Sequence, residues 1–265
     1  MYSLPVLVFK YLKYKVKASN SKGHGVHSPF VFEFITEILM DNRSFYSFDF
    51  IENHRSKLLQ NHNEIEVLDF GAGSRLSLTK TRKINKIAKA SLKPKKFGQL
   101  FFKIINHYGY KNILELGTCL GITTAYLATA NNKATITTME GAPNIAKLAQ
   151  DFFKQKELDN TNVIIGNFDE TLPKFLETAE FLDFVYIDGN HQYKPTLNYF
   201  EQLLPKLTEN AVVVFDDIYW SKEMEMAWNE VKSTTANCIT IDLFYVGIVF
   251  FGKNFKQKEH FVVNF

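Results

Sequence analysis

The sequence predicts a doubly wound α/β fold with a mostly parallel sheet of seven strands, an antiparallel last strand and an N-terminal helical extension. From Phe101 onward, apolar β-type runs alternate with segments of helical periodicity, which is typical of a parallel sheet with crossover helices. Residues 113–130 (ILELGTCLGITTAYLATA) form a strand, a glycine turn and a helix start. The short link at residues 245–247 permits a hairpin, so the last strand is expected to be antiparallel.

The predicted elements follow one another along the C-terminal two thirds of the chain. The predicted strands are 112–116, 134–139, 161–165, 182–187, 211–215, 238–244 and 246–251. The predicted helices are 99–108, 121–130, 143–156, 170–178, 195–205 and 222–233. We expect two domains, an N-terminal helical extension or substrate lid at 1–98 and a ligand-binding domain at 99–265.

The amino-acid composition of the chain is that of a globular protein. The 265 residues are 46% hydrophobic and 22% charged, which is an ordinary globular balance with an ample core. The net charge of +3 is too small to indicate a nucleic-acid partner. Cys119 and Cys238 give neither a disulfide framework nor a metal-binding spacing, and they fit a reducing, cytoplasmic setting. The apolar run at residues 4–9 is too short to span a bilayer and no cleavage pattern follows it, so we expect neither a secretory signal nor stable membrane insertion.

The N-terminal extension opens with a segment that could form a basic amphipathic helix. A glycine-rich turn with His24 and His27 then leads into a predicted helix over residues 29–40, where Pro29 suits the first turn. The two histidines are candidates to reach a substrate pocket as part of a lid. The alternative is a structural turn that seats the first helix.

Two further segments of the extension carry weaker signals. Residues 66–74 (EVLDFGAGS) resemble a second strand and glycine turn, but no strand ending in an acid follows about twenty residues later, as a ribose-binding unit requires. Residues 80–103 hold nine basic residues and no acidic one. We interpret them as a solvated helical face with Ile84, Ile87 and Leu92 opposite, and phosphate binding is the alternative.

The glycine turn after the first strand of the predicted sheet is the main ligand-site candidate. Glu115 lies near the end of the strand, and Gly117 and Gly121 precede the helix. Glycine lets the backbone turn sharply and approach a ligand closely, and a helix N-terminus favours a nucleotide-like group. A dinucleotide site and an S-adenosylmethionine site share this pattern, so the turn alone does not choose between them.

Polar residues at the ends of the next two strands extend this candidate site. Glu140 is placed to accept hydrogen bonds from two ribose hydroxyls, and the alternative is a helix N-cap or a charge at the positive end of a helix. Asn167 is a candidate for an adenine edge and Phe168 for the adenine face. The alternative there is a loop in which Asp169 or Glu170 starts a helix.

The fourth and fifth strands end in acidic residues. Asp188 and His191 follow the fourth strand, and Asp216 and Asp217 follow the fifth. Three carboxylates in one cleft repel one another, so a cation or protonation is needed, and oxygen ligands suit Mg²⁺. The alternative is that an aspartate caps the helix beginning near Ser221. His191 is a candidate base because histidine titrates near neutrality, although a loop histidine is usually a polar surface residue.

Together these motifs resemble the class I S-adenosylmethionine-dependent methyltransferases. Within that class they are most similar to divalent-metal-dependent O-methyltransferases, including the catechol, caffeoyl-coenzyme A and macrocin-type enzymes. The resemblance covers about residues 99–252 and implies a Rossmann-like fold. The N-terminal segment GHGVHSPFVF (residues 23–32) also resembles the start of a group of bacterial methyltransferases of this type. The strings that carry the main resemblance are LELGTCLGITTAYLA, GNFDETLP, IDGNHQY and VVVFDD, together with Glu140.

The resemblance implies S-adenosylmethionine as the donor and Mg²⁺ or another divalent cation as the metal. The implied donor-binding residues are Glu115, Gly117, Thr118, Gly121, Glu140, Gly141, Asn167, Phe168 and Asp188. The implied metal ligands are Asp188, Asp216 and Asp217, and the implied catalytic residues are His191 and Asp188.

Three positions depart from the family pattern. Cys119 replaces the middle glycine of the turn. Asp217 stands where catechol-type enzymes have asparagine, although macrocin-type enzymes have a similar pair of aspartates. His191 stands where catechol enzymes place a lysine, which leaves the identity of the base open.

The predicted function is metal-assisted O-methylation of a small-molecule hydroxyl. A nicotinamide-dependent oxidoreductase would share the glycine turn and Glu140, but it would not explain the aspartates after the later strands. A non-catalytic donor-binding protein stays open as an alternative. A nucleic-acid methyltransferase is disfavoured because no Asn-Pro-Pro-Tyr-like motif follows the fourth strand. The oligomeric state is open, although similar proteins commonly form homodimers.

Overall fold

A computed structural model describes residues 1–18, 27–69 and 78–265 of the chain. His24 and the glycines of the 66–74 segment lie outside these residues. The chain forms two compact units, one of residues 43–180 and one of residues 1–42 with 181–265. Within the described ranges, no helix has both the length and the apolar character needed to cross a membrane.

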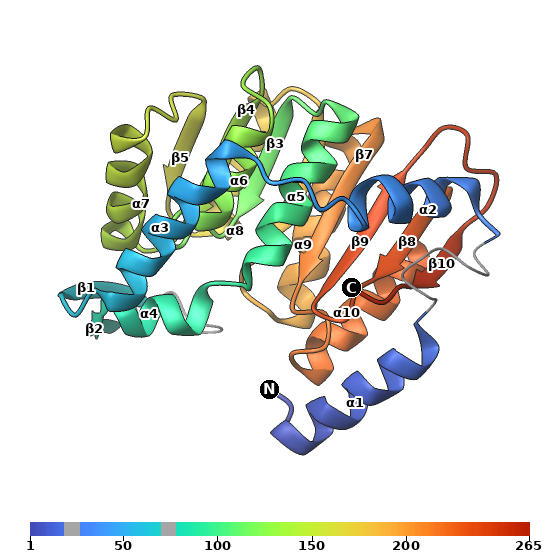
Figure 1. Ribbon diagram of the computed structural model, residues 1–265, viewed down its shortest axis with the longest axis horizontal. Helices are drawn as coiled ribbons and strands as arrows, with labels where there is room; N and C mark the ends of the chain where they lie inside the picture. Colours follow the sequence, from blue (N-terminus) through green and yellow to red (C-terminus); the bar gives the residue numbers. More distant parts are fainter. Residues whose placement is uncertain (19–26, 70–77) are drawn as a thin grey trace. The chain divides into compact units, whose positions relative to one another are not determined.

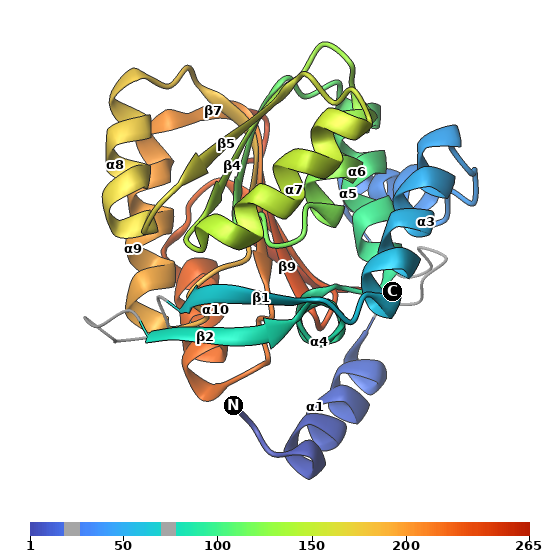
Figure 2. The ribbon, with the colours of Figure 1, turned by 90° about the vertical axis from the view of Figure 1, so that its left-hand side faces the viewer.

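The unit of residues 43–180 contains three parallel strands in the order β3-β4-β5 (Figure 1). The register pairs Leu116 with Met139 and Glu140 with Ile165, so the carboxyl ends of neighbouring strands lie together. In Figure 2, α7 runs across β4 and β5. These elements are β3 (Asn112–Leu116), α6 (Ile122–Ala130), β4 (Thr135–Glu140), α7 (Pro143–Gln155), β5 (Thr161–Ile165) and α8 (Phe168–Thr178).

The same unit includes helices and a hairpin that precede β3 in the sequence. α5 packs against α6, and α3 packs against both α6 and α4. Ile84 and Ile87 are buried while the lysines of α4 are exposed, which confirms the predicted solvated face. Residues 80–83, however, belong to an antiparallel strand rather than to a helix. The elements are α3 (Tyr46–Gln60), β1 (Glu64–Asp69), β2 (Leu78–Lys83), α4 (Ile84–Ser91) and α5 (Lys95–Tyr108).

The unit of residues 1–42 and 181–265 contains five strands in the order β10-β8-β9-β7-β6. β6 and β7 are parallel, and β9 is antiparallel to both β7 and β8. The predicted antiparallel strand is therefore confirmed. The strands are β6 (Leu182–Ile187), β7 (Leu207–Asp216), β8 (Cys238–Asp242), β9 (Val246–Phe251) and β10 (Glu259–Val262).

Three details of these strands differ from the prediction, and the first is that β7 spans Leu207–Asp216 rather than 211–215. β8 ends at Asp242, two residues early, because Phe244 adopts a left-handed conformation (φ +69°) and turns the chain into β9. β10 was not predicted, and it pairs in parallel with β8. Its sequence, EHFV, is too short to carry a clear period-two pattern.

Helices complete this unit, and the predicted N-terminal helix is present. The predicted helix over residues 29–40 is also present, although its second half is wound as a π-helix. These helices are α1 (Leu4–Lys17), α2 (Pro29–Glu33), the π-helix η1 (Phe34–Leu39), α9 (Tyr193–Leu203), the 3₁₀ turn η2 (Leu204–Lys206) and α10 (Lys222–Thr234).

The fold class is α/β and Rossmann-like, with a mixed, mostly parallel arrangement of strands and N-terminal helices, as predicted. The compact units do not follow the predicted boundary at residue 98, since residues 1–42 and 43–98 belong to different units. The functional division into an extension and a ligand-binding domain stays a prediction.

Candidate functional site

The glycine turn after β3 is built from left-handed backbone conformations. Gly117, Cys119 and Gly121 all have positive φ, at +114°, +46° and +76°. The backbone N–H groups of Gly117 and Thr118 both donate to the Met139 carbonyl oxygen, at 2.9 and 3.0 Å. A left-handed cysteine is uncommon and costs backbone energy, and such strain concentrates at ligand sites. The turn leads directly into the N-terminus of α6.

Glu140 connects the end of β4 to this turn. Its Oε2 accepts the Cys119 N–H at 2.9 Å, and its Oε1 accepts the Ala142 N–H at 2.8 Å. Burial raises the pKa of Glu140, and the backbone N–H donors partly offset that rise. An ionised carboxylate has about four acceptor positions. The Gly141 N–H is a third backbone donor to this carboxylate, so about one position is left for a ligand hydroxyl. The contact of Glu140 with a ribose stays a prediction.

Glu115 lies beneath the turn in a network of hydroxyl groups. It is fully buried, and its Oε2 accepts hydrogen bonds from Thr124 Oγ1 at 2.5 Å and Thr138 Oγ1 at 2.6 Å. Thr118, which is also buried, bonds to Thr138 through its hydroxyl at 2.6 Å. Within the described ranges, Glu115 Oε1 has no hydrogen-bond partner. Glu115 and Thr118 thus both belong to this buried network, and their contact with a donor stays a prediction.

The buried carboxyl of Glu115 should make stability depend on pH. Burial raises its pKa from 4.5 to about 8, so the folded chain keeps a proton that the unfolded chain loses. Stability should therefore fall as the pH rises from about 4.5 to about 8. Glu115→Gln keeps the shape without the charge, and we expect its urea midpoint to change less than that of the wild type between pH 5 and pH 8. An equal change of the urea midpoint in both proteins would contradict the raised pKa of Glu115.

Gly121 and Gly109 form a matched pair for testing the turn. Both are left-handed, but an added Cβ at Gly121 would lie 2.7 Å from the Phe153 ring, whereas one at Gly109 would have nothing within 4 Å. We expect Gly109→Ala to cost about 1–2 kcal/mol from the backbone alone. Gly121→Ala adds overpacking and should cost about 2–5 kcal/mol in total. Chemical denaturation measures both values, and equal costs would show that the crowding at Gly121 is relieved.

Asn167 follows β5 and caps α8. Its side-chain oxygen accepts the Asp169 N–H at 3.1 Å, and the helix begins at Phe168. Asp169 and Glu170 therefore lie in the first helical turn and do not start the helix, which corrects that alternative. Asn167 and Phe168 are both partly exposed. Their contact with adenine stays a prediction.

The loop after β6 carries Asp188 and His191. The two side chains approach to 3.5 Å between His191 Nε2 and Asp188 Oδ1, and Tyr186 donates its hydroxyl to Asp188 Oδ2 at 3.1 Å. Asn190 and His191 have positive φ, at +64° and +21°. Asn190 also donates to the Tyr199 hydroxyl at 3.0 Å, which holds the loop. A carboxylate beside a histidine ring can fix the ring's orientation, as a general base requires.

The end of β7 carries the other two aspartates. Because Ile187 pairs with Phe215, the residues that follow, Asp188 and Asp216, continue from neighbouring positions of adjacent parallel strands. Asp216 is buried, and Asp217 is left-handed with φ +52°. The helix α10 is capped by Ser221, whose Oγ accepts the Met224 N–H at 3.1 Å. The alternative in which an aspartate caps this helix is therefore wrong.

The predicted three-aspartate metal site is not assembled in this structure. In residues 1–18, 27–69 and 78–265, no three side chains of histidine, cysteine, aspartate or glutamate are grouped so that they could hold a metal ion. Asp217 lies just beyond β7, where its left-handed backbone ends the extended strand, so the strand register does not place its side chain. The register supports at most the neighbouring pair Asp188 and Asp216.

Comparison with known protein families finds one that matches the part of the chain with the candidate site. Residues 114–218 match the family model described as a methyltransferase domain. This range contains the glycine turn, Glu140, Asn167, Asp188, His191, Asp216 and Asp217. Residues 114–218 are therefore similar to a methyltransferase domain.

Solved structures share the fold of this chain at low sequence identity. The O-methyltransferase TomG from Streptomyces achromogenes, involved in tomaymycin synthesis and solved with S-adenosylmethionine, is 19% identical with a TM-score of 0.53, covering 61% of this chain and 82% of its own. The O-methyltransferase from Bacillus cereus, solved with S-adenosylhomocysteine, is 15% identical with a TM-score of 0.55. The match covers 89% of this chain and 98% of that protein. The methyltransferase PaMTH1 from Podospora anserina, also bound to S-adenosylhomocysteine, is 13% identical with a TM-score of 0.56. The match covers 81% of this chain and 100% of that protein.

One curated relative matches a shorter part of the chain. It is named "Uncharacterized protein R132" of Acanthamoeba polyphaga mimivirus and is 32% identical over 69 residues. The match covers 24% of this chain and 31% of the relative. The chain thus spans about a third of the length of the curated relative that it matches.

Several residues in and around the candidate site were missed by the sequence analysis. Thr124 and Thr138 hold Glu115, and no local motif marks them, because their contacts depend on how the strands pair. Ser91, at the end of α4, accepts a hydrogen bond from Cys119 Sγ at 3.1 Å, so the N-terminal extension reaches the glycine turn. Asn190 could have been found, since a Gly-Asn pair after a strand is a turn signal that tolerates left-handed backbone.

Proposed function

We propose that the chain is an S-adenosylmethionine-dependent methyltransferase that acts on the hydroxyl group of a small molecule. The observation that carries the proposal is Glu140, whose carboxylate is fixed against the strained glycine turn by the Cys119 N–H. The matched methyltransferase domain supports the reaction class. The O-methyltransferases among the similar structures support oxygen as the accepting atom.

The proposed reaction is a direct transfer. The acceptor oxygen forms a bond to the donor methyl carbon while the bond from that carbon to the sulfonium sulfur breaks. S-adenosylhomocysteine leaves, and the hydroxyl proton must go to a base. Because a sulfonium is already a good leaving group, the protein's main task is to place the two reactants in line, and such positioning can contribute about 7–11 kcal/mol.

His191 is the proposed base, and Asp188 is proposed to position it. The 3.5 Å approach of Asp188 Oδ1 to His191 Nε2 would stabilise the imidazolium that forms when the proton is taken up. The left-handed backbone of His191 supports this role, because strained residues gather at reactive sites.

A divalent cation such as Mg²⁺ is the second element of the proposal. Its support is the neighbouring pair of carboxylates, Asp188 and Asp216, because hard cations prefer oxygen ligands. The described residues do not bring three ligands together as they stand. Water or the acceptor would have to supply the rest, and Mg²⁺ usually keeps several waters.

Release of S-adenosylhomocysteine tests the function and its metal element together. The protein is incubated with S-adenosylmethionine and a panel of catechols, sugars and other hydroxyl compounds, and methyl ethers are sought by mass spectrometry. With an accepted substrate, we expect EDTA to lower the rate at least about tenfold and added Mg²⁺ to restore it. A full rate in EDTA removes the cation from the proposal but leaves methyl transfer standing. Methylation at nitrogen or carbon alone would refute the proposed acceptor.

A further inference from the structure

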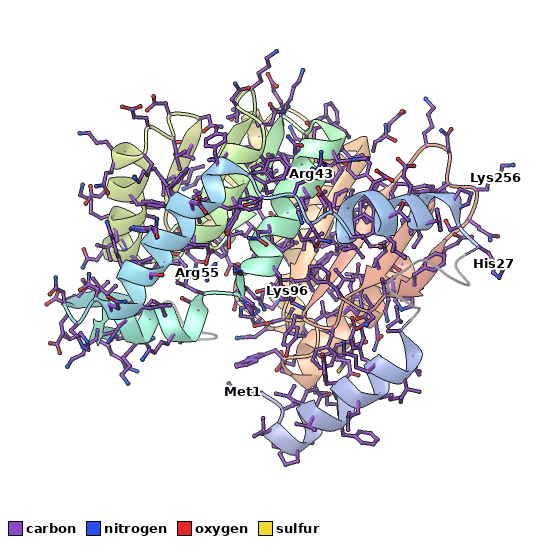
Figure 3. All side chains as sticks on the ribbon, viewed as in Figure 1. Met1, His27, Arg43, Arg55, Lys96 and Lys256 are labelled. Carbon is purple, nitrogen blue, oxygen red and sulfur yellow. The ribbon has the colours of Figure 1, made fainter. Side chains whose placement is uncertain are left out.

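The N-terminal helix α1 has two faces with different surroundings. One face packs on its own unit, where Tyr14 is buried and Tyr11 packs edge-on against Phe244 at 5.0 Å between ring centroids. Lys10 on this side forms an ion pair with Glu225 of α10, at 2.7 Å. The other face carries large apolar side chains that are exposed. In Figure 3, which labels Met1, side chains of α1 project away from the ribbon on its outer side.

The exposed apolar side chains form a continuous stripe. At 3.6 residues per turn, positions 8, 9, 12 and 16 fall on one side of a helix. Phe9 is 68% exposed, Leu12 58% and Val16 88%. Isolated apolar residues on a surface are common, but a contiguous stripe of this kind marks an interaction site. We call Val8, Phe9, Leu12 and Val16 the outer stripe of α1.

Lysines flank the outer stripe on both sides. Lys13 and Lys17 lie along one edge and Lys15 along the other, and all three are exposed. Lys15 also donates to the side chain of Asn264. Residues 1–18 contain no acidic residue at all. An apolar stripe bordered by lysines is the pattern of a helix that lies in the surface of an anionic membrane.

The length of α1 and its charges distinguish between two candidate partners, a membrane and a second copy of the chain. Its 14 residues extend about 21 Å, too short for the ~30 Å hydrocarbon core, so α1 can lie on a bilayer but not span it. A second copy of the chain docking through the same face would bring lysines against lysines, with no acid in residues 1–18 to pair with them. Anionic lipid headgroups complement the lysines, and the acyl boundary accepts the apolar side chains.

We propose that α1 binds the surface of anionic membranes through its outer stripe and the flanking lysines. The helix is also tied to the loop after β7, since the Tyr2 N–H donates to the Trp220 carbonyl oxygen at 2.9 Å and Tyr2 donates its hydroxyl to Glu225 at 2.6 Å. Trp220 follows Asp217 by three residues and is partly exposed. Membrane binding would therefore tie the loop that carries the predicted aspartates to a membrane-bound helix.

Co-sedimentation of the full chain with vesicles tests this proposal. Vesicles of phosphatidylcholine with phosphatidylserine are compared with vesicles of phosphatidylcholine alone. We expect binding to the anionic vesicles, weakened by high salt because the charges are screened. The double variant Phe9→Ser/Leu12→Ser should bind at least about tenfold more weakly, because both side chains lose apolar area.

The matched control is Phe181→Ser/Leu204→Ser, which removes an exposed phenylalanine (60%) and leucine (40%) elsewhere in the same unit. We expect it to bind like the wild type. Since all four side chains are exposed, both double variants should keep the thermal unfolding midpoint of the wild type, which is measured alongside. Absence of vesicle binding, or equal loss in the two variants, would overturn the proposal. So would a wild-type dimer that becomes a monomer in Phe9→Ser/Leu12→Ser without any lipid binding.

Discussion

Replacing Glu140 by alanine is expected to lower the affinity for S-adenosylhomocysteine by at least about tenfold. A hydrogen bond to a charged group contributes about 1.5–3 kcal/mol, and three backbone N–H groups leave the carboxylate about one position for a ribose hydroxyl. Losing that bond corresponds to about one to two orders of magnitude in the dissociation constant. Isothermal titration calorimetry measures the change directly.

Glu140 also holds the turn, so the structural effect must be separated from the binding effect. Glu140→Gln keeps the size of the side chain and part of its acceptor capacity, and we expect an intermediate affinity. Glu177→Gln, at an exposed position of α8, is the matched control and should bind like the wild type. If Glu140→Ala binds the product normally while its unfolding midpoint falls, the side chain serves only the fold.

The affinity should also depend on pH in a defined direction. Hydroxyl donors favour the ionised carboxylate, and burial raises the pKa of Glu140 above its ordinary value. Binding should therefore weaken as the pH falls through that raised pKa. This loss should be absent in Glu140→Gln.

Replacing His191 by alanine is the second change with a large expected effect. With an accepted hydroxyl substrate, kcat should fall about 10²–10⁴-fold, which is the usual contribution of a positioned general base. The affinity for S-adenosylhomocysteine should stay within about twofold of the wild type, because His191 is proposed to act on the acceptor. Steady-state kinetics and calorimetry give the two readouts.

His107→Ala is the control for this variant, since His107 is an exposed histidine on α5. It should leave both quantities unchanged. An unchanged kcat in His191→Ala would show that this side chain does not accept the proton. Equal losses of rate and donor affinity would instead indicate a general disturbance of the loop.

Much of the fold could be predicted because its signals are local. Apolar runs that alternate with helical periodicity specify β3 to β9 and the helices between them, and the glycine turn marks where β3 ends. β10 was missed because four residues carry too little pattern. The π-helical winding of residues 34–39 was missed because its sequence has an ordinary helical period.

The candidate site was predictable only in part. The sequence places an acid at the end of each strand, and Glu140 has the contacts that such a residue needs. It does not show which groups surround each acid, so the burial of Glu115 among the hydroxyls of Thr124 and Thr138 was not foreseen. The three aspartates were expected to converge, but the register brings only Asp188 and Asp216 to neighbouring positions. Long-range packing decides both outcomes, and no local spacing encodes it.

The central claim is that the turn at residues 117–121 and Glu140 bind an S-adenosylmethionine-type ligand. Parallel calorimetric titrations of the wild-type chain with S-adenosylhomocysteine and with NAD⁺ test it most directly. We predict saturable one-to-one binding of S-adenosylhomocysteine, lost in Glu140→Ala, and no measurable heat with NAD⁺. Saturable binding of NAD⁺ with none of S-adenosylhomocysteine would contradict the claim and favour a nicotinamide-dependent enzyme.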